Sequence, residues 1–192
     1  EPEQRPTPET APKLPLSPYG VTKLSAEQYL FYYHKVHGME YAALRYANIF
    51  GPRQDPHGEA GVVAIFCSRI LRNQPLTIFG DGEQTRDYTF VEDVVRANMV
   101  VTEAPLAEAR TLDDRAFNVG TSKETSVNEL ADVLMTAAGR RVTVNHAPEP
   151  AGELRHSSLS AARLRKLGWE PRVSLQEGLR STYTFIAAKE TR

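Results

Sequence analysis

Hydrophobic residues recur every three or four positions along six segments of the chain, with polar residues between them. This spacing places the apolar side chains on one face of a helix. The longest of these segments, 18–37, has a broad apolar face that we expect to be buried. The pattern predicts helices over residues 18–37, 62–71, 91–102, 127–138, 161–167 and from 175 onwards. Ser126 and Ser174 each precede a glutamate by three positions, the pattern of a capping box at a helix start.

Shorter apolar runs between these helices predict strands over residues 40–46, 76–79, 116–119 and 142–145. The run over 40–46 is nearly continuous, as expected for a buried strand of a parallel sheet. Stretches rich in glycine and proline, at 53–61 and 147–156, predict loops. The pattern as a whole is typical of an α/β protein.

The composition and charge give no indication of a nucleic-acid or membrane partner. The 192 residues include 23 Lys+Arg and 24 Asp+Glu, giving a formal net charge of −1 with no block of like charge. Nothing therefore indicates a nucleic acid or an anionic membrane surface as a partner. No apolar run approaches the ~20 residues that cross a bilayer, so we expect no membrane segment and a cytoplasmic location. The single cysteine, Cys67, excludes an internal disulfide and is expected in the core.

The start of the first predicted helix carries candidate catalytic chemistry. Ser17 suits the N-cap and Pro18 the first helical position, so Tyr19 and Lys23 lie on one face, four residues apart. An ammonium group near a phenol favours the phenolate, which can accept a proton from a sugar or alcohol hydroxyl. The alternative is an ordinary exposed pair, because Tyr and Lys are often found at this spacing on helix surfaces.

Four motifs follow one another along the chain: Pro18–Lys23, Leu44–Pro52, Ile78–Tyr88 and Phe90–Val94. In this order they resemble the extended short-chain dehydrogenase/reductase family, and within it the NAD-dependent sugar-nucleotide epimerases and dehydratases. The resemblance covers nearly the whole chain. It is closest to the enzymes of this family that epimerise C4 of UDP-glucose.

The resemblance implies a fold, a cofactor and partners. The fold would be the C-terminal part of a Rossmann-like doubly wound sheet plus a small α/β substrate-binding domain. Residues 1–52 would belong to the NAD-binding domain and 53–192 mainly to the sugar-nucleotide-binding domain, with 88–120 returning to the first. The cofactor would be NAD, the substrate a UDP-sugar, and the full-length protein a homodimer. The reaction would transfer a hydride at the sugar C4 through a 4-keto intermediate.

The resemblance also implies roles for individual residues. Tyr19 and Lys23 would be catalytic, and both would contact NAD together with Tyr46 and Ala47. The substrate would be bound by Asn48, Val62, Val63, Ile78, Arg86 and Arg155, with the two arginines on its diphosphate. No metal site is expected, because the sequence places no Cys or carboxylate cluster beside its closest histidine pair, His34 and His37.

Two of these roles have simple structural alternatives. Asn48 follows a predicted strand, and the alternative to substrate binding is that it only closes a turn through its side chain. Arg86 stands beside Asp87, and the alternative to phosphate binding is that the two form a surface ion pair without function.

The chain also departs from the family at Ser157–Ser160, where many relatives place an aspartate. This departure weakens the transfer of substrate contacts to that segment.

Two features of the family have no counterpart in this sequence. It contains no G-x-x-G-x-x-G turn for the dinucleotide pyrophosphate and no catalytic Ser or Thr a few dozen residues before Tyr19. We therefore expect the C-terminal portion of a longer enzyme, inactive on its own. A nucleotide-sugar 4,6-dehydratase, a decarboxylase and a non-catalytic nucleotide-sugar binder are the alternative functions.

Overall fold

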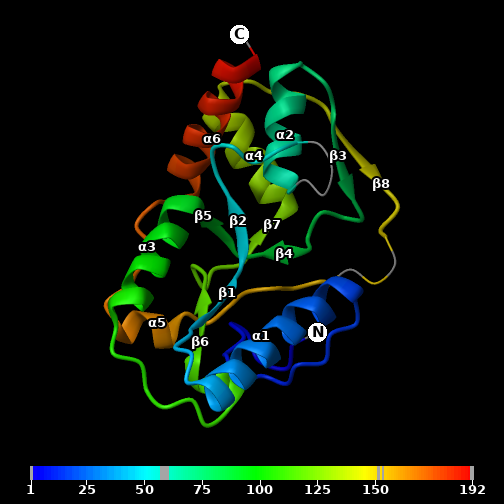
Figure 1. The fold of residues 1–192 in the computed structure, drawn as a ribbon. Coiled ribbons are helices and arrows are strands. Elements are labelled where there is room, and N and C mark those ends of the chain that lie inside the picture. The colour runs from blue at the N-terminus through cyan, green and yellow to red at the C-terminus, as the bar shows by residue number, and fades with distance from the viewer. Residues whose placement is uncertain (1, 57–60, 151, 153, 191–192) are drawn as a thin grey trace.

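The computed structural model describes residues 2–56, 61–150, 152 and 154–190, which form an α/β structure (Figure 1). The helices are α1 (Pro18–His37), α2 (Val62–Leu71), α3 (Val91–Glu103), α4 (Val127–Ala138), α5 (Ala162–Lys166) and α6 (Leu175–Glu190), with a short 3₁₀-helix η1 (Leu112–Arg115). The strands are β1 (Ala43–Tyr46), β2 (Asn48–Phe50), β3 (Leu76–Phe79), β4 (Thr85–Arg86), β5 (Tyr88–Phe90), β6 (Ala116–Val119), β7 (Thr125–Ser126) and β8 (Val144–Ala147). The predicted α/β class is confirmed, and every predicted helix and strand is present with ends shifted by a few residues.

The described strands pair two by two. β1 pairs with β6, β2 with β5 and β3 with β8 in parallel, whereas β4 and β7 are antiparallel. The hydrophobic pattern does not predict β2, β4, β5 or β7, because two or three residues are too few to show an alternation. The strands at 43–50 pair with those at 88–90 and 116–119. The division into two domains stays a prediction.

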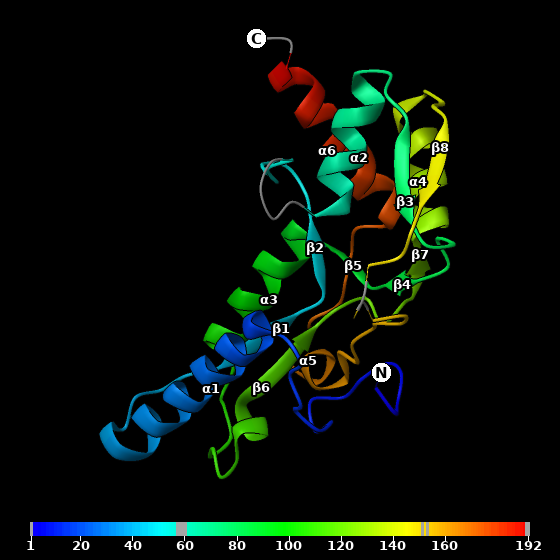
Figure 2. The same ribbon diagram turned by 90° about the vertical axis from the view of Figure 1, so that its right-hand side faces the viewer.

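Of the three hydrophobic clusters among the described residues, the two larger ones stabilise opposite ends of the molecule (Figure 2). In the larger cluster, α2, α4 and α6 pack together beside β3 through fully buried residues that include Ile70, Leu130 and Leu179. In the second, α5 packs on β6 through Leu164, and Trp169, which follows α5, is buried in the same cluster. Trp169 points inward as predicted, and its Nε1 donates to the Asp93 carbonyl oxygen at 2.9 Å.

Cys67 lies inside the larger cluster and is fully buried, as predicted. Burial raises the pKa of its thiol to about 12. The thiol therefore stays protonated at neutral pH and behaves as a small apolar side chain.

The ends of α1 follow directly from the sequence. The Ser17 Oγ accepts a hydrogen bond from the Gly20 amide at 3.1 Å, and Pro18 occupies the first turn. Gly38 ends the helix in the left-handed conformation, with φ of 70°. These local signals fix where the helix bearing Tyr19 begins and ends.

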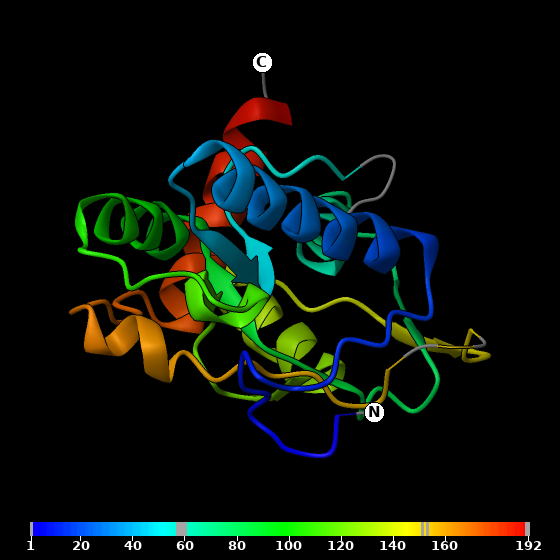
Figure 3. The same cartoon turned by 60° about the horizontal axis from the view of Figure 1, so that its bottom comes forward.

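The predicted burial of the apolar face of α1 is wrong for this structure, since no residue of α1 is buried. Val21, Tyr29, Tyr32 and Val36 are all largely exposed. Figure 3 shows α1 lying along the outside of the molecule. Apolar spacing identifies side chains that share a face, but it does not determine whether another part of the structure covers that face.

An ion-pair network joins α1 to strand β1. Arg45 of β1 donates to both carboxylate oxygens of Glu27 on α1, at 2.9 and 2.6 Å, and to Asp113 Oδ1 at 3.1 Å. Lys13 Nζ donates to the other oxygen of Asp113 at 2.7 Å. The side chains of Arg45 and Glu27 are only 20% and 16% exposed. The network therefore sets the position of the helix that carries Tyr19.

We expect the Arg45→Met variant to have a free energy of unfolding about 3 kcal/mol lower than wild type, because Glu27 would keep a poorly hydrated charge without its cation. Urea unfolding followed by circular dichroism measures this difference. Arg72→Met is the matched control, because Arg72 pairs with Glu190 and its side chain is 49% exposed. That variant should lose less than about 1 kcal/mol. Equal losses in the two variants would contradict the role of the network.

Candidate functional site

A hollow of about 560 Å³ opens between α2 and the strands β3, β4 and β5. Its apolar wall comes from α2, β3 and the start of α4, and consists of Val62, Ile65, Phe66, Ile78, Phe79 and Val127. The sequence predicts one part of this wall, because Val62, Ile65 and Phe66 fall on one side of the helix over 62–71. A hollow of this size with an apolar wall suits the planar ring of a small ligand.

The polar side chains that line the hollow include Asn48, Gln84 and Arg86. Arg86 lies in β4, and its Nη1 donates to the Thr85 carbonyl oxygen at 2.8 Å. A guanidinium group presents its donors in a planar fork that fits phosphate oxygens. The hollow therefore combines an apolar wall for a ring with a cation for an anionic group.

Asn48 lies in a strand. The alternative left open by the sequence, that its side chain closes a turn, is therefore wrong. It begins β2, lies opposite Tyr88 in the register, and its backbone amide donates to the Asp87 carbonyl oxygen at 2.9 Å. The chain stays extended after β1 because β5 provides a second parallel partner. Asn48 thus lines the same hollow as Arg86.

Asp87 turns inward and is 1% exposed. Its Oδ1 accepts from the amide and hydroxyl of Thr121 at 2.8 and 2.7 Å. Its Oδ2 accepts from the amides of Ser122 and Leu159 at 3.0 and 3.3 Å. A Cβ atom added to Gly120 would lie 2.5 Å from this Oδ2, so glycine is needed for the close approach. Sequence reasoning missed this anchor and offered Asp87 only as a surface partner of Arg86, which is wrong.

Arg155 is not among the residues that line the hollow. Its Nη1 and Nη2 donate to the two carboxylate oxygens of Asp81 at 2.8 and 2.7 Å. Its backbone nevertheless runs beside β4, because the Thr85 amide donates to the Arg155 carbonyl oxygen at 2.9 Å. The structure thus brings the predicted arginine next to the site, with its side chain paired to a carboxylate.

Tyr19 and Lys23 lie together on α1, as the helical spacing predicts. The Lys23 Nζ is 5.0 Å from the centre of the Tyr19 ring, and the tyrosine is 67% exposed. Neither residue lines the hollow. Their catalytic role stays a prediction, and the exposed phenol is accessible to a partner or ligand on that side.

The remaining predicted contacts lie at the end of β1 and in α2. The Tyr46 hydroxyl and the Asn98 side chain are hydrogen-bonded, with the hydroxyl 3.1 Å from Oδ1. The Ala47 amide donates to the Val119 carbonyl oxygen at 3.0 Å. Val63 is buried in the core, and its side chain does not line the hollow, so only its backbone could meet a ligand there.

The sequence profile of the NAD dependent epimerase/dehydratase family matches residues 1–120, more than half of the chain. The chain belongs to this family. The matched segment contains Tyr19, Lys23, Asn48 and Arg86. The family assignment made from the motifs is therefore confirmed, including the NAD dependence of the family.

Several relatives of this epimerase-family chain are named as UDP-sugar epimerases, and others are named GDP-mannose 3,5-epimerase. A putative UDP-glucose 4-epimerase of Methanocaldococcus jannaschii is 43% identical over 186 residues, which cover 97% of this chain and 58% of the relative. The crystal structure of Thermotoga maritima UDP-glucose 4-epimerase with UDP-glucose matches with a TM-score of 0.91 and 44% identity, over 99% of this chain and 59% of that one. The UDP-glucose 4-epimerase of Thermus thermophilus, in complex with NAD, matches with a TM-score of 0.85 and 39% identity, over 95% and 58%. The chain thus spans somewhat more than half the length of these relatives.

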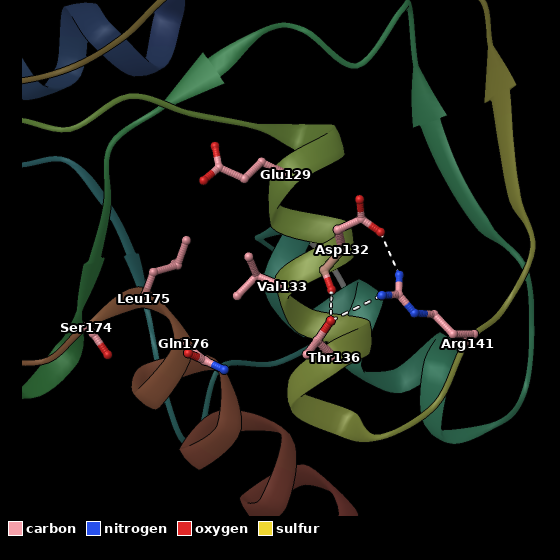
Figure 4. A pocket seen from close by; sticks show the side chains of 8 residues that line it. All are labelled: Glu129, Asp132, Val133, Thr136, Arg141, Ser174, Leu175 and Gln176. Atoms are coloured by element: carbon pink, nitrogen blue, oxygen red, sulfur yellow. Dashed lines mark hydrogen bonds and ion pairs between the residues drawn. The ribbon is translucent and has the colours of Figure 1, made fainter.

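A second hollow of this epimerase-family chain lies between α4 and the start of α6 (Figure 4). It has a volume of about 500 Å³ and contains no sequence-predicted site residue. Arg141 pairs there with Asp132 at 2.6 Å and donates to the Thr136 hydroxyl at 3.3 Å. The arginine that lines this hollow is already paired with a carboxylate and no predicted site residue lies there, so the hollow beside Arg86 is the candidate site.

Within the ranges that the structure describes, no three His, Cys, Asp or Glu side chains are grouped so that they could hold a metal ion. No helix in those ranges has both the length and the apolar character needed to cross a bilayer.

Proposed function

We propose that this chain is the C-terminal part of an NAD-dependent UDP-glucose 4-epimerase, and that its hollow holds the nucleotide of the UDP-sugar. The observation that carries the proposal is the combination of an apolar wall with Asn48 and Arg86 in one hollow. The names of the relatives, which include UDP-glucose 4-epimerases, support the same substrate class.

Different walls of the hollow bind the base and the diphosphate of the sugar nucleotide. The base lies against the wall formed by α2 and β3, near Val62 and the backbone of Ile78. The Arg86 guanidinium binds the diphosphate, and the Asn48 amide lines the same hollow. Binding through the nucleotide leaves the hexose without fixed contacts to this hollow, so the sugar can present either face to the reacting groups.

The chemical step depends on α1. Tyr19 accepts the proton of the sugar 4-hydroxyl and later returns it, with the Lys23 ammonium 5.0 Å from the centre of its ring. The exposed Lys23 ammonium also suits the hydroxyls of the nicotinamide ribose, with Tyr46 and Ala47 at the end of β1 as further contacts to NAD. When bound, NAD supplies the acceptance and return of a hydride at the sugar C4.

Three further features belong to the proposal. The exposed aromatic face of α1 is covered in the full-length protein, which is a homodimer. The enzyme works in the cytoplasm. The 192 residues alone do not epimerise UDP-glucose, because they contain no glycine-rich dinucleotide turn.

Calorimetric titration with UDP and with uridine tests the nucleotide site. We expect the chain to bind UDP, and Arg86→Met to weaken UDP binding by about 10- to 100-fold, the range for a charge-assisted hydrogen bond. Uridine should bind the two proteins equally, because it lacks phosphates. Arg141→Met, in the second hollow, is the matched control and should leave UDP affinity unchanged. Failure of the folded chain to bind UDP would reject the proposed function.

A further inference from the structure

The segment that carries Arg155 runs beside β4, the strand that carries Arg86, because the Thr85 amide donates to the Arg155 carbonyl oxygen. Thr85 of β4 forms a parallel bridge with His156, and the Thr85 Oγ1 lies 3.0 Å from the His156 Nδ1, so these two side chains share one face. Side chains alternate along extended chains. Gln84 and Arg86, which flank Thr85, therefore point to the opposite face, and Arg155 directly precedes His156 on the neighbouring segment. Gln84 and Arg86 line the hollow, so this is the face of the candidate site.

Asp81 is held firmly in the turn between β3 and β4. Gly80 and Gly82 on either side have φ of 69° and 78°, and a Cβ atom on Gly82 would lie 2.1 Å from the Asn128 Oδ1. The Glu83 amide donates to the Asp81 Oδ1 at 2.9 Å, and the Asn128 side chain donates to the Asp81 carbonyl oxygen at 3.0 Å. The carboxylate therefore has a fixed place at which it meets Arg155.

The pair between Asp81 and Arg155 has the geometry that a phosphate group would also satisfy. Two parallel N–H···O bonds of 2.8 and 2.7 Å join the guanidinium to the carboxylate. The hydrogen bonds from Arg155 hold the pKa of Asp81 at about 2, so Asp81 stays ionised at neutral pH. Both side chains are exposed, 38% for Arg155 and 56% for Asp81. An exposed ion pair contributes little to stability, so a competing anion can replace one partner.

We propose that Asp81 is an internal stand-in for the substrate's diphosphate: it holds Arg155 beside the hollow, and the diphosphate takes its place when the nucleotide binds. This inference rests on the proposed function. Asp81 thereby keeps the Arg155 guanidinium in one position between turnovers and assists product release by competing for it. A ligand without phosphate cannot displace it, so Asp81 adds selectivity for nucleoside diphosphates over nucleosides.

Titrations of UDP and uridine into wild type and Asp81→Asn test the exchange. The variant should bind UDP about two- to five-fold more tightly, the range expected when an exposed competing ion pair is removed. Its uridine affinity should equal that of wild type. Glu149→Gln is the matched control, because Glu149 acts on Arg155 through its charge. Screening by salt should keep its effect on UDP affinity below about 1.5-fold.

Two further measurements separate exchange from a general charge effect. In the Asp81→Asn, Arg155→Met double variant the gain in UDP affinity should disappear. The Nε resonance of Arg155 in nuclear magnetic resonance spectra should shift when UDP is added to wild type and stay unchanged on addition of uridine.

Unchanged or weaker UDP binding by a folded Asp81→Asn variant would overturn the exchange alone, because wild type would still bind UDP. Absence of UDP binding by wild type would overturn the exchange and the proposed function together.

Discussion

Replacing Tyr19 by phenylalanine is expected to lower the rate of UDP-glucose epimerisation by about 10²- to 10⁴-fold, the contribution typical of a positioned general base. The substitution removes only the hydroxyl that accepts the proton and keeps the ring beside Lys23. UDP affinity should stay unchanged, because Tyr19 does not line the hollow. The rate is measured on the full-length enzyme with NAD, by chromatographic separation of the two UDP-hexoses.

Tyr29→Phe is the matched control for this experiment. Tyr29 lies on the same helix and is also 67% exposed, so its substitution removes an equivalent hydroxyl from α1. We expect that variant to keep the wild-type rate. A Tyr19→Phe enzyme with a rate within about twofold of wild type would reject the catalytic role and favour a non-catalytic nucleotide-sugar binder. Mass analysis of the product separates an epimerase from the alternatives, since a dehydratase loses water and a decarboxylase loses carbon dioxide.

The Asp87→Ala variant is expected to have a free energy of unfolding about 3–5 kcal/mol lower than wild type, because buried donors of Thr121, Ser122 and Leu159 lose their acceptor. Thermal and urea unfolding measure this loss. UDP binding should weaken as well, because Asp87 lies between Arg86 and Tyr88, two residues that line the hollow.

Asp132→Ala serves as the control for Asp87→Ala. Asp132 pairs with Arg141 at 2.6 Å, but its side chain is 69% exposed. Removing it should cost less than about 1 kcal/mol and leave UDP affinity unchanged. An Asp87→Ala protein with the unfolding midpoint of wild type would show that the carboxylate is not the anchor that its hydrogen bonds indicate.

The helix boundaries were predictable because capping depends on residues three or four positions apart. Ser126 accepts from the Glu129 amide at 3.1 Å, and Ser174 and Glu177 form the reciprocal hydrogen bonds of a capping box. The short strands were not predictable in the same way. β2 and β5 exist as strands because they pair with each other, 40 positions apart by the register that sets Asn48 opposite Tyr88.

Some features of the site were likewise predictable from local motifs, and others depended on distant contacts. The family motifs named Asn48, Val62, Ile78 and Arg86 from separate parts of the chain, and the structure gathers all four around one hollow. The ion pair between Arg155 and Asp81 was not predictable, because Asp81 lies 74 positions away in a turn that contains two glycines. The burial of the Asp87 side chain was not predictable either, since its partner Thr121 is 34 positions distant.

The sequence by itself determined the family, the α/β class, the caps of the helices and the pairing of Tyr19 with Lys23 on one helical face, because each depends on neighbouring residues or on recognisable local motifs. Only the tertiary structure decided which face of α1 is exposed, which carboxylate is buried and which arginine is already paired. Those outcomes depend on contacts between segments far apart in the chain, where the free energy of burial and the geometry of hydrogen bonds select one arrangement.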